Sequence, residues 1–286
     1  MSFPNLIDSF YKHFNEQETS EYNPKDPHFA PSYLANCGRQ TYYKKTNTKP
    51  SDPISDTSLF KMHFGKIQHQ GLQDILVKMP GYKIVEMEKE NDIEYQGLKF
   101  KYFIDCIIEW GEDVTEGMNV FGKTEQYIIE IKTIFGRAVD FIKKEPKEDH
   151  MLQTLSYMGF KKIKKAIILY IDRGSGYQVQ HNIESNGDLT LNGKEINHYR
   201  KIWADKIHEL SWVKAAILAE QLYARQYNIV IKKINGSLVF DFQKDSVKYK
   251  SDWQCTYCQY KTECWQEVIG GMAKKGRNFY IGGKYE

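Results

Sequence analysis

Two carboxylates and a lysine stand inside segments that are otherwise apolar. Asp105 lies in KFKYFIDCIIEW, and Glu130 and Lys132 lie in YIIEIKTIF. Burying a carboxylate is costly unless it binds a cation or a partner. Because side chains alternate along a strand, Glu130 and Lys132 point the same way. With Asp105 on the preceding strand, they could hold Mg²⁺ and order a water whose pKa the metal lowers. The alternative is a structural Glu130–Lys132 ion pair, with Asp105 at a strand edge.

Three further side chains could join such a site. His69 stands at the edge of a helical apolar stripe, beside Leu72 and Leu76, where a neutral imidazole can bind a metal. Gln153 and Tyr157 are four residues apart in a predicted helix, so they share a face that could contact a phosphate or a base. Taken singly, each is weak: His69 also fits a boundary residue, and a surface helix supplies such pairs by chance.

The cysteines indicate a second metal site. The chain has five, Cys37, Cys106, Cys255, Cys258 and Cys264, and an odd number argues against a disulfide framework. The CxxC at Cys255 and Cys258, followed by Cys264, supplies three ligands, and a tetrahedral ion or an iron–sulfur cube needs a fourth. Cys106 points to the apolar face of its strand, which leaves Cys37 in a polar segment. The spacing alone leaves zinc and iron–sulfur both open. Either would close a very large loop.

The elements that would position these residues follow from periodicity. Helices are predicted over 58–79, 147–160 and 193–227, and strands over 98–110, 127–135 and 166–172. The first helix would bury Phe64, Ile67, Ile75 and Met79. A long hairpin connection would join the first two strands, and residues 1–30 would form a flexible lead-in. This order predicts an α/β (α+β) fold with a central mixed sheet flanked by helices.

Composition sets wider bounds. The 286 residues, 41% hydrophobic and 14% aromatic, suit one large domain. A net charge of +3 permits a nucleic-acid partner without requiring one. No apolar run is long enough to cross a membrane, and the first residues lack the pattern of a secretory signal, so we expect a cytoplasmic protein without a membrane partner.

The order of the motifs resembles a known family. Gly65-x-x-x-His69, Asp105, Glu130-Ile131-Lys132 and Gln153-x-x-x-Tyr157 stand where the RecB-like branch of the PD-(D/E)XK nuclease superfamily has its motifs. The resemblance implies a restriction-endonuclease-like core over about 58–175. It implies that His69, Asp105, Glu130 and the carbonyl of Ile131 bind Mg²⁺ or Mn²⁺. Asp105, Glu130 and Lys132 would be catalytic, with Lys132 positioning or deprotonating the attacking water, and Gln153 and Tyr157 would contact DNA.

A second motif narrows the resemblance. Ser32-x-Leu34-x-x-Cys37-x-Arg39-x-x-Tyr42 is similar to the N-terminal motif of the iron–sulfur members of that branch. The resemblance therefore implies a [4Fe–4S] cluster held by Cys37, Cys255, Cys258 and Cys264. Residues 31–286 would form a single nuclease domain, with its iron–sulfur part drawn from 31–45 and about 250–268, and a helical part over about 193–228.

The function implied is that of a single-domain exonuclease of the CRISPR-associated type, which phages also carry. We expect hydrolysis of single-stranded DNA ends with 5′-to-3′ polarity, in recombination, repair or CRISPR-related processing, inside a bacterial or phage-infected cell. Proteins of those pathways are the expected protein partners, and the oligomeric state stays open. Lysines on both sides of the Gln153 helix predict a DNA surface, or else a solvated charged face. Two other classes stay open, namely a non-catalytic DNA-binding or adaptor protein with this fold and a zinc-ribbon interaction module.

Overall fold

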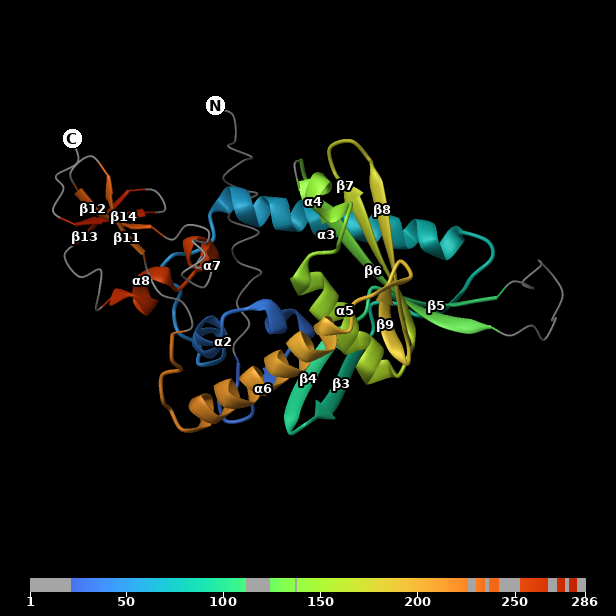
Figure 1. Cartoon of the computed structure of the whole chain (residues 1–286), viewed down its shortest axis with the longest axis horizontal. Coiled ribbons are helices and arrows are strands. Elements are labelled where there is room, and N and C mark those ends of the chain that lie inside the picture. Colours follow the sequence, from blue (N-terminus) through green and yellow to red (C-terminus); the bar gives the residue numbers. More distant parts are fainter. Residues whose placement is uncertain are drawn as a thin grey trace, which may run out of the picture. The chain divides into compact units, whose positions relative to one another are not determined.

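The computed structural model describes residues 22–111, 124–136, 138–225, 230–234, 237–241, 253–266, 272–275 and 278–281 (Figure 1). The chain forms two compact units. Among the described residues, the first unit contains His28–Ala35 and Leu59–Ser211, and the second contains 22–27, Asn36–Ser58 and the chain from Trp212 onward. Most of the predicted lead-in, residues 1–21, lies outside the described residues, as does the hairpin connection at 112–123.

A seven-stranded mixed sheet forms the centre of the first unit. Its order is β10-β9-β8-β7-β6-β5-β2. The strands are β2 (Lys83–Glu86), β5 (Cys106–Trp110), β6 (Glu125–Ile134), β7 (Lys165–Asp172), β8 (Gln178–Asn186), β9 (Asp188–Leu191) and β10 (Lys194–Glu195). The β6–β7 pair is parallel and the other neighbours are antiparallel. The predicted mixed sheet is therefore confirmed.

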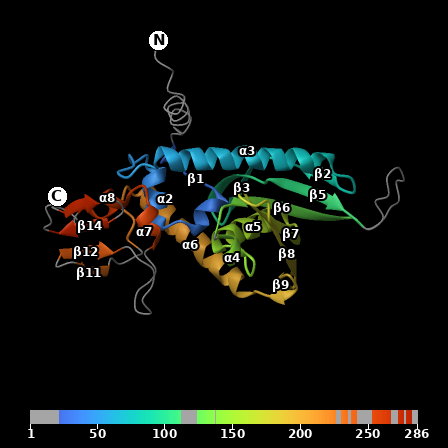
Figure 2. The ribbon, with the colours of Figure 1, turned by 90° about the horizontal axis from the view of Figure 1, so that it is seen from above.

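Helices cover the sheet on both faces, as predicted (Figure 2). The helices that lie at least partly in this unit are η1 (Pro31–Ala35), α3 (Asp56–Lys78), α4 (Ala138–Ile142), α5 (Glu148–Lys161) and α6 (His198–Leu218). On β6, Ile129 and Ile131 pack against Leu72 and Leu76 of α3. Because side chains alternate along a strand, Glu130 and Lys132 point to the opposite face of the sheet, which α5 covers.

The face that α3 buries differs from the predicted one. Phe64, Ile67, Ile75 and Met79 are exposed. The helix instead buries Gln73, with Leu72 and Leu76 partly buried beside it. The prediction was wrong because α3 carries apolar residues on two faces, and helical spacing alone cannot say which face meets the sheet.

The predicted strand over 98–110 is two strands in two sheets. β4 (Leu98–Phe103) lies between β1 (His28–Phe29) and β3 (Glu90–Tyr95), whereas β5 belongs to the seven-stranded sheet. The break falls at Ile104 and Asp105, where the Glu88 N–H donates to the Ile104 carbonyl at 3.0 Å. The Asp105 carboxylate thus stands at a strand junction and not within a strand.

The second unit contains short helices and a small sheet. Its helices are α2 (Gly38–Lys45), α7 (Trp253–Tyr257) and α8 (Lys261–Cys264). Its antiparallel sheet has the order β11-β12-β14-β13, made of Val230–Ile234, Ser237–Asp241, Asn278–Ile281 and Met272–Lys275. The predicted helix over 193–227 is shorter, because α6 ends at Leu218. In the part of the chain that the structure describes, no helix is both long and apolar enough to span a membrane.

Candidate metal centres

Asp105 lies immediately before β5 and contacts residues of both α3 and β6. Its Oδ2 accepts a hydrogen bond from the backbone N–H of Ile131 on β6, at 2.6 Å. The same oxygen lies 2.9 Å from Nε2 of His69 on α3. The break before β5 frees Asp105 from strand pairing, so its side chain can reach both neighbours.

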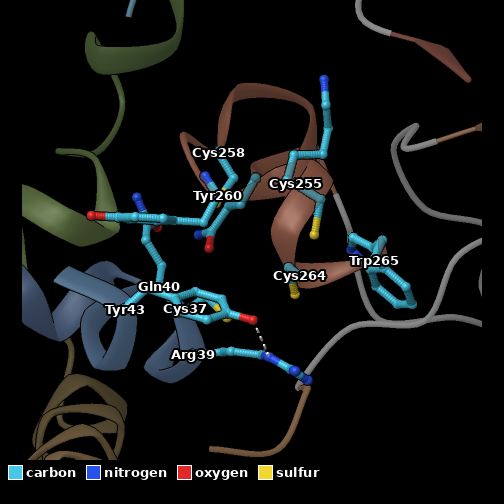
Figure 3. A pocket seen from close by; sticks show the side chains of 11 residues that line it. Cys37, Arg39, Gln40, Tyr43, Cys255, Cys258, Tyr260, Cys264 and Trp265 are labelled. Carbon is cyan, nitrogen blue, oxygen red and sulfur yellow. Dashed lines mark hydrogen bonds between the residues drawn. The ribbon is translucent and has the colours of Figure 1, made fainter. Parts of the chain in front are cut away.

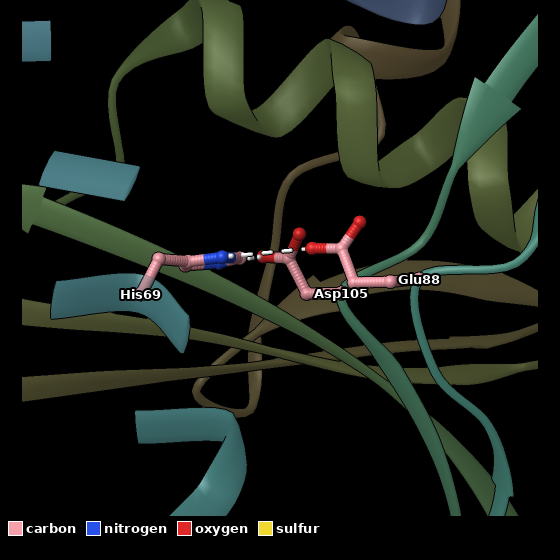
Figure 4. A group of neighbouring side chains, drawn as sticks. All are labelled: His69, Glu88 and Asp105. Atoms are coloured by element: carbon pink, nitrogen blue, oxygen red, sulfur yellow. Dashed lines mark ion pairs between the residues drawn. The ribbon is translucent and has the colours of Figure 1, made fainter. Parts of the chain in front are cut away.

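His69, Glu88 and Asp105 form a group that could hold a metal ion (Figure 4). One ligand atom from each lies within 4.8 Å of the others. His69 Nδ1 is 3.6 Å from Glu88 Oε1, so the ring lies close to both carboxylates. Two carboxylates and one imidazole suit a hard divalent cation such as Mg²⁺ or Mn²⁺.

The protonation of His69 depends on this surrounding charge. Burial alone would lower its pKa, but the hydrogen bond and charge of Asp105, with the charges of Glu88 and Glu130, raise the pKa overall. A bound cation would compete with that proton, because a ligating imidazole must be neutral.

Glu130 is the strongest sign that a cation belongs here. Its side chain is 0% exposed, and within the described residues its Oε2 has no hydrogen-bond partner. Lys132 Nζ lies 2.5 Å from the other oxygen, Oε1, as an ion pair. Burial and the Asp105 charge raise the pKa of Glu130 to about 7, against the lowering charge of Lys132. A buried carboxylate with an unsatisfied oxygen, close enough to Asp105 and His69 for their charges to shift its pKa, fits a cation site.

Lys132 is held as a cation on the α5 side of the sheet. Burial would lower its pKa, but the charges of Glu130 and Asp105 outweigh burial and raise it. Its Nζ also donates to Gln153 Oε1 at 3.2 Å. A protonated lysine suits the positioning of a water and the stabilisation of a phosphate better than proton abstraction.

Gln153 and Tyr157 come together on one face of α5, as their spacing predicts. The Gln153 amide donates to the Tyr157 hydroxyl at 2.7 Å. Tyr157 is 3% exposed and stacks on Tyr102, with 5.6 Å between ring centroids. Gln153 is partly exposed and joins Lys132 to this buried ring, so of the two it is better placed to reach a ligand. Their contact with DNA stays a prediction.

Two residues of the site were missed from the sequence. Glu88 belongs to the metal group, and Gln73 donates to Glu88 Oε1 at 2.8 Å and to the Asp105 carbonyl at 3.2 Å. Gln73 is one helical turn from His69, a spacing that could have drawn attention to it. Glu88 precedes β3 in a charged stretch with no distinguishing spacing, so only the fold reveals it.

Several of the lysines predicted to face DNA are engaged within the protein. Lys143 pairs with Asp140, Lys161 with Glu86, and Lys165 with Glu125. Such pairing reduces the net positive potential that would attract a phosphate backbone.

Four cysteines line one pocket of the second unit (Figure 3). These are Cys37, at the start of α2, with Cys255, Cys258 and Cys264 from α7, α8 and the turn between them. All four are partly buried. Cys106 is instead packed in the core of the first unit, as predicted, and burial raises its pKa to about 11.

The pocket has features expected around bound thiolates. The Tyr260 N–H donates to Cys258 Sγ at 3.4 Å. Arg225 donates to the Cys264 carbonyl at 2.9 Å, and its guanidinium lies 4.6 Å from the centre of the Trp265 ring. Burial raises the pKa of Cys258 to about 12, so its thiolate needs a cationic partner.

Comparisons with known proteins identify no family. No family profile and no curated protein matches the sequence. Among solved structures, the crystal structure of SSO0001 is 17% identical, covering 91% of this chain and 94% of that chain with a TM-score of 0.47. An alkaline exonuclease (LHK-Exo) from Laribacter hongkongensis is 11% identical, covering 74% of this chain and 95% of that chain with a TM-score of 0.44. Both TM-scores lie below 0.5, so the chemistry of the site rests on its own residues.

Proposed function

We propose that this protein is a metal-dependent DNA exonuclease that hydrolyses phosphodiester bonds at single-stranded ends. The observation that carries the proposal is the fully buried Glu130 carboxylate, whose Oε2 has no hydrogen-bond partner in the described part of the chain. It stands beside Lys132 and is close enough to Asp105 and His69 for their charges to shift its pKa. A structural ion pair alone would leave the second carboxylate oxygen of Glu130 unsatisfied.

The residues of the site would have different roles in phosphodiester hydrolysis. Glu130, Asp105, His69 and the Ile131 carbonyl would hold Mg²⁺ or Mn²⁺, with Glu88 as an additional ligand that the resemblance did not imply. When bound, the ion supplies a low-pKa water and a counter-charge for the phosphate. Lys132 orients that water and neutralises charge developing on the phosphate oxygens.

Gln153 and the backbone around β6 would position the DNA. The Gln153 carbonyl oxygen accepts from Lys132 and its amide donates to Tyr157, so the amide orientation is fixed from both ends. A fixed Gln153 in turn orients Lys132, as efficient catalysis requires.

The cysteine pocket supports a [4Fe–4S] cluster in the second unit. Four cysteines line this pocket, which matches the number of thiolate ligands that such a cube requires. The same four thiolates also suit a zinc ion, so the metal content of the protein distinguishes the two alternatives. A role in recombination, repair or CRISPR-related processing, in a bacterial or phage-infected cell, remains the expectation of the resemblance.

The test is a cleavage assay on end-labelled single strands, with protein purified without air. Cleavage should require Mg²⁺ or Mn²⁺, and Asp105→Ala and Glu130→Ala should each abolish it. Lys132→Ala should retain metal and DNA binding but turn over about 100-fold more slowly or worse, because its contribution belongs to the transition state. Glu94→Ala, an exposed carboxylate on β3, is the matched control and should cut normally.

The outcomes separate the two function classes. A folded Glu130→Ala protein that cuts at the wild-type rate would refute the proposal. Wild-type protein that binds DNA and never cuts it, with either metal, would instead identify a non-catalytic DNA-binding or adaptor protein.

A further inference from the structure

The strands β6 and β7 finish at one end of the sheet, beside α4 (Figure 1). Three exposed aromatic residues belong to the segments at this end. Phe135 follows the last residue of β6 and is 70% exposed. Phe141 on α4 is 75% exposed, and Tyr177 in the β7–β8 turn is 51% exposed. Large aromatic side chains left in water can form part of a binding site when they share one face of a protein.

The loops that carry these rings are tied to one another. Asp172, at the end of β7, accepts hydrogen bonds from the backbone N–H groups of Gly174 and Ser175, each at 3.2 Å. It also accepts one from the backbone of Gly136, in the loop after β6. The Arg173 N–H donates to the Ile134 carbonyl at 2.9 Å. The two loops therefore form one scaffold, which reduces the entropy lost when a ligand binds.

The rings are held outward by specific contacts. A Cβ on Gly174 would lie 3.5 Å from Phe135 Cε2, so the ring lies against the turn of the next hairpin. Ile142 is buried, and its carbonyl is 2.6 Å from His181 Nε2. Anchoring Ile142 inward fixes α4 and leaves Phe141 directed to solvent.

Tyr177 lines an open groove of about 570 Å³ between these loops. Asp140, Lys143 and Asp172 are among the residues that line it. Lys143 Nζ lies 5.2 Å from the centre of the Tyr177 ring and 3.1 Å from Asp140. With its lysine paired and two carboxylates present, the groove is a poor phosphate site. The Tyr177 ring offers apolar surface to a flat, uncharged ring.

The group is near the metal centre. Phe135 is three residues beyond Lys132, which corresponds to about 10 Å along a strand. A Cβ on Gly65 of α3 would lie 3.4 Å from Thr133 Oγ1 and 3.7 Å from Arg173 Nη1, so α3 passes beside this end of β6 one turn before His69. A strand cut at the metal centre would reach the rings within a few nucleotides.

We infer that Phe135, Phe141 and Tyr177 form a platform on which unpaired nucleobases stack beside the metal centre. The inference rests on the proposed function and assigns residues to strand capture that the nuclease motifs do not include. Every base offers a π-face, so such a platform binds without sequence preference and requires an unpaired strand. A protein partner on the same rings is the competing occupant, and the test separates the two.

The experiment measures binding without cleavage. A single-stranded oligonucleotide carrying 2-aminopurine near its 5′ end is titrated with protein in EDTA, and its fluorescence reports stacking. The wild type should bind and quench the probe. The Phe135→Leu/Phe141→Leu double variant keeps apolar surface without aromatic rings, and it should bind about tenfold more weakly and lose the quenching. The corresponding Trp double variant should restore both.

Two controls isolate the platform. Trp110→Ala removes an exposed aromatic from the opposite end of the sheet, beside Glu125 at the start of β6, and should leave binding and quenching unchanged. A strand of abasic sites should bind the wild type and the Leu double variant equally, because it offers no base to stack.

Each outcome of the titration either supports or overturns the inferred platform. The inference is overturned if the Leu double variant binds and quenches like the wild type, if abasic strands discriminate between the proteins in the same way, or if the wild type binds no single strand. A wild type that stacks bases but never cuts with metal would refute the proposed exonuclease and leave the platform standing.

Discussion

At the scale of single residues, two carboxylates with different hydrogen bonding define the candidate metal centre. Glu130 Oε1 pairs with Lys132 and its Oε2 has no hydrogen-bond partner in the described part of the chain, whereas Asp105 Oδ2 contacts both His69 and the Ile131 amide. Gln73 holds Glu88 and the Asp105 backbone together from α3. Desolvation therefore dominates the pKa of Glu130. The two contacts of Asp105 instead fix the orientation of its carboxylate.

The first prediction concerns the pH dependence of metal-free stability. Burial raises the pKa of Glu130 to about 7, from 4.5 for the free side chain. Between those values the folded protein holds a proton that the unfolded chain has released, so the free energy of unfolding falls as pH rises. Glu130→Gln cannot ionise and should lack that part of the fall, worth at most about 3 kcal/mol. Urea unfolding in EDTA at pH 5 and pH 8 measures this.

The expected pattern is a stabilised Glu130→Gln protein at pH 8 and little difference at pH 5. Glu94→Gln, an exposed carboxylate, is the matched control and should show no such dependence. An equal stability difference for Glu130→Gln at both pH values would contradict the assignment of a buried, proton-holding carboxylate.

The second prediction concerns Gln73, which contacts ligands without being one. Gln73→Met keeps the volume and removes both hydrogen bonds to Glu88 and Asp105. Loss of such supporting contacts typically weakens metal affinity 10- to 100-fold. Calorimetric titration with Mn²⁺ measures the change. Gln70→Met, on the exposed side of the same helix, removes a hydrogen bond to Asp74 and should leave the affinity unaltered.

At the scale of elements, α3 decides how the site is assembled. It brings His69 and Gln73 to the sheet by burying Leu72 and Leu76, and it leaves a second apolar face in solvent. Gly65 lies where the helix approaches Thr133, whereas Gly71 has no neighbouring atom within 4 Å of its Cβ position. Substituting these two glycines of one helix should therefore have different consequences.

The third prediction uses these two glycines. Gly71→Ala should raise the free energy of unfolding by about 0.5–1 kcal/mol, because alanine restricts the unfolded chain and fits an exposed helical position. Gly65→Val should not stabilise, and it should weaken Mn²⁺ binding by moving His69 away from Asp105. Thermal unfolding and metal titration of both variants provide the check. Wild-type metal affinity in a stably folded Gly65→Val protein would show that α3 does not set the ligand distance.

At the scale of the whole molecule, residues from distant parts of the chain complete the cysteine pocket. Cys37 lies at the start of α2, and the other three cysteines come after residue 254. A cluster held by all four would close a very long loop and so remove much unfolded-state entropy. We therefore expect the folding of the second unit to depend on the proposed cluster.

The fourth prediction concerns that core. Protein purified without air should be brown, with iron and acid-labile sulfide near four each per chain, as a cube with four cysteine ligands requires. Cys37→Ala should lose the colour as fully as Cys258→Ala. Cys106→Ala, in the core of the first unit, should keep it. Stoichiometric zinc without sulfide, from iron-replete cells, would exclude the cluster and leave the zinc alternative.

The sequence by itself determined the mixed sheet between helices, the strand that carries Glu130 and Lys132, and the helix that places Gln153 beside Tyr157. These features depend on local periodicity, which can be seen directly in the sequence. The sequence also singled out the four cysteines that share a pocket. The domain layout, with its lead-in over 1–30 and one nuclease domain over 31–286, stays a prediction.

Only the tertiary structure decided which face of α3 is buried, where the strand at Asp105 breaks, that Glu88 belongs to the metal group and that Gln73 donates hydrogen bonds to two of its members. Each depends on which distant surface an element meets. The two apolar faces of α3 are distinguished by the sheet that covers one of them, and Asp105 leaves its strand because His69 and the Ile131 amide bind its carboxylate. Such contacts join residues far apart in the chain, where no periodicity connects them.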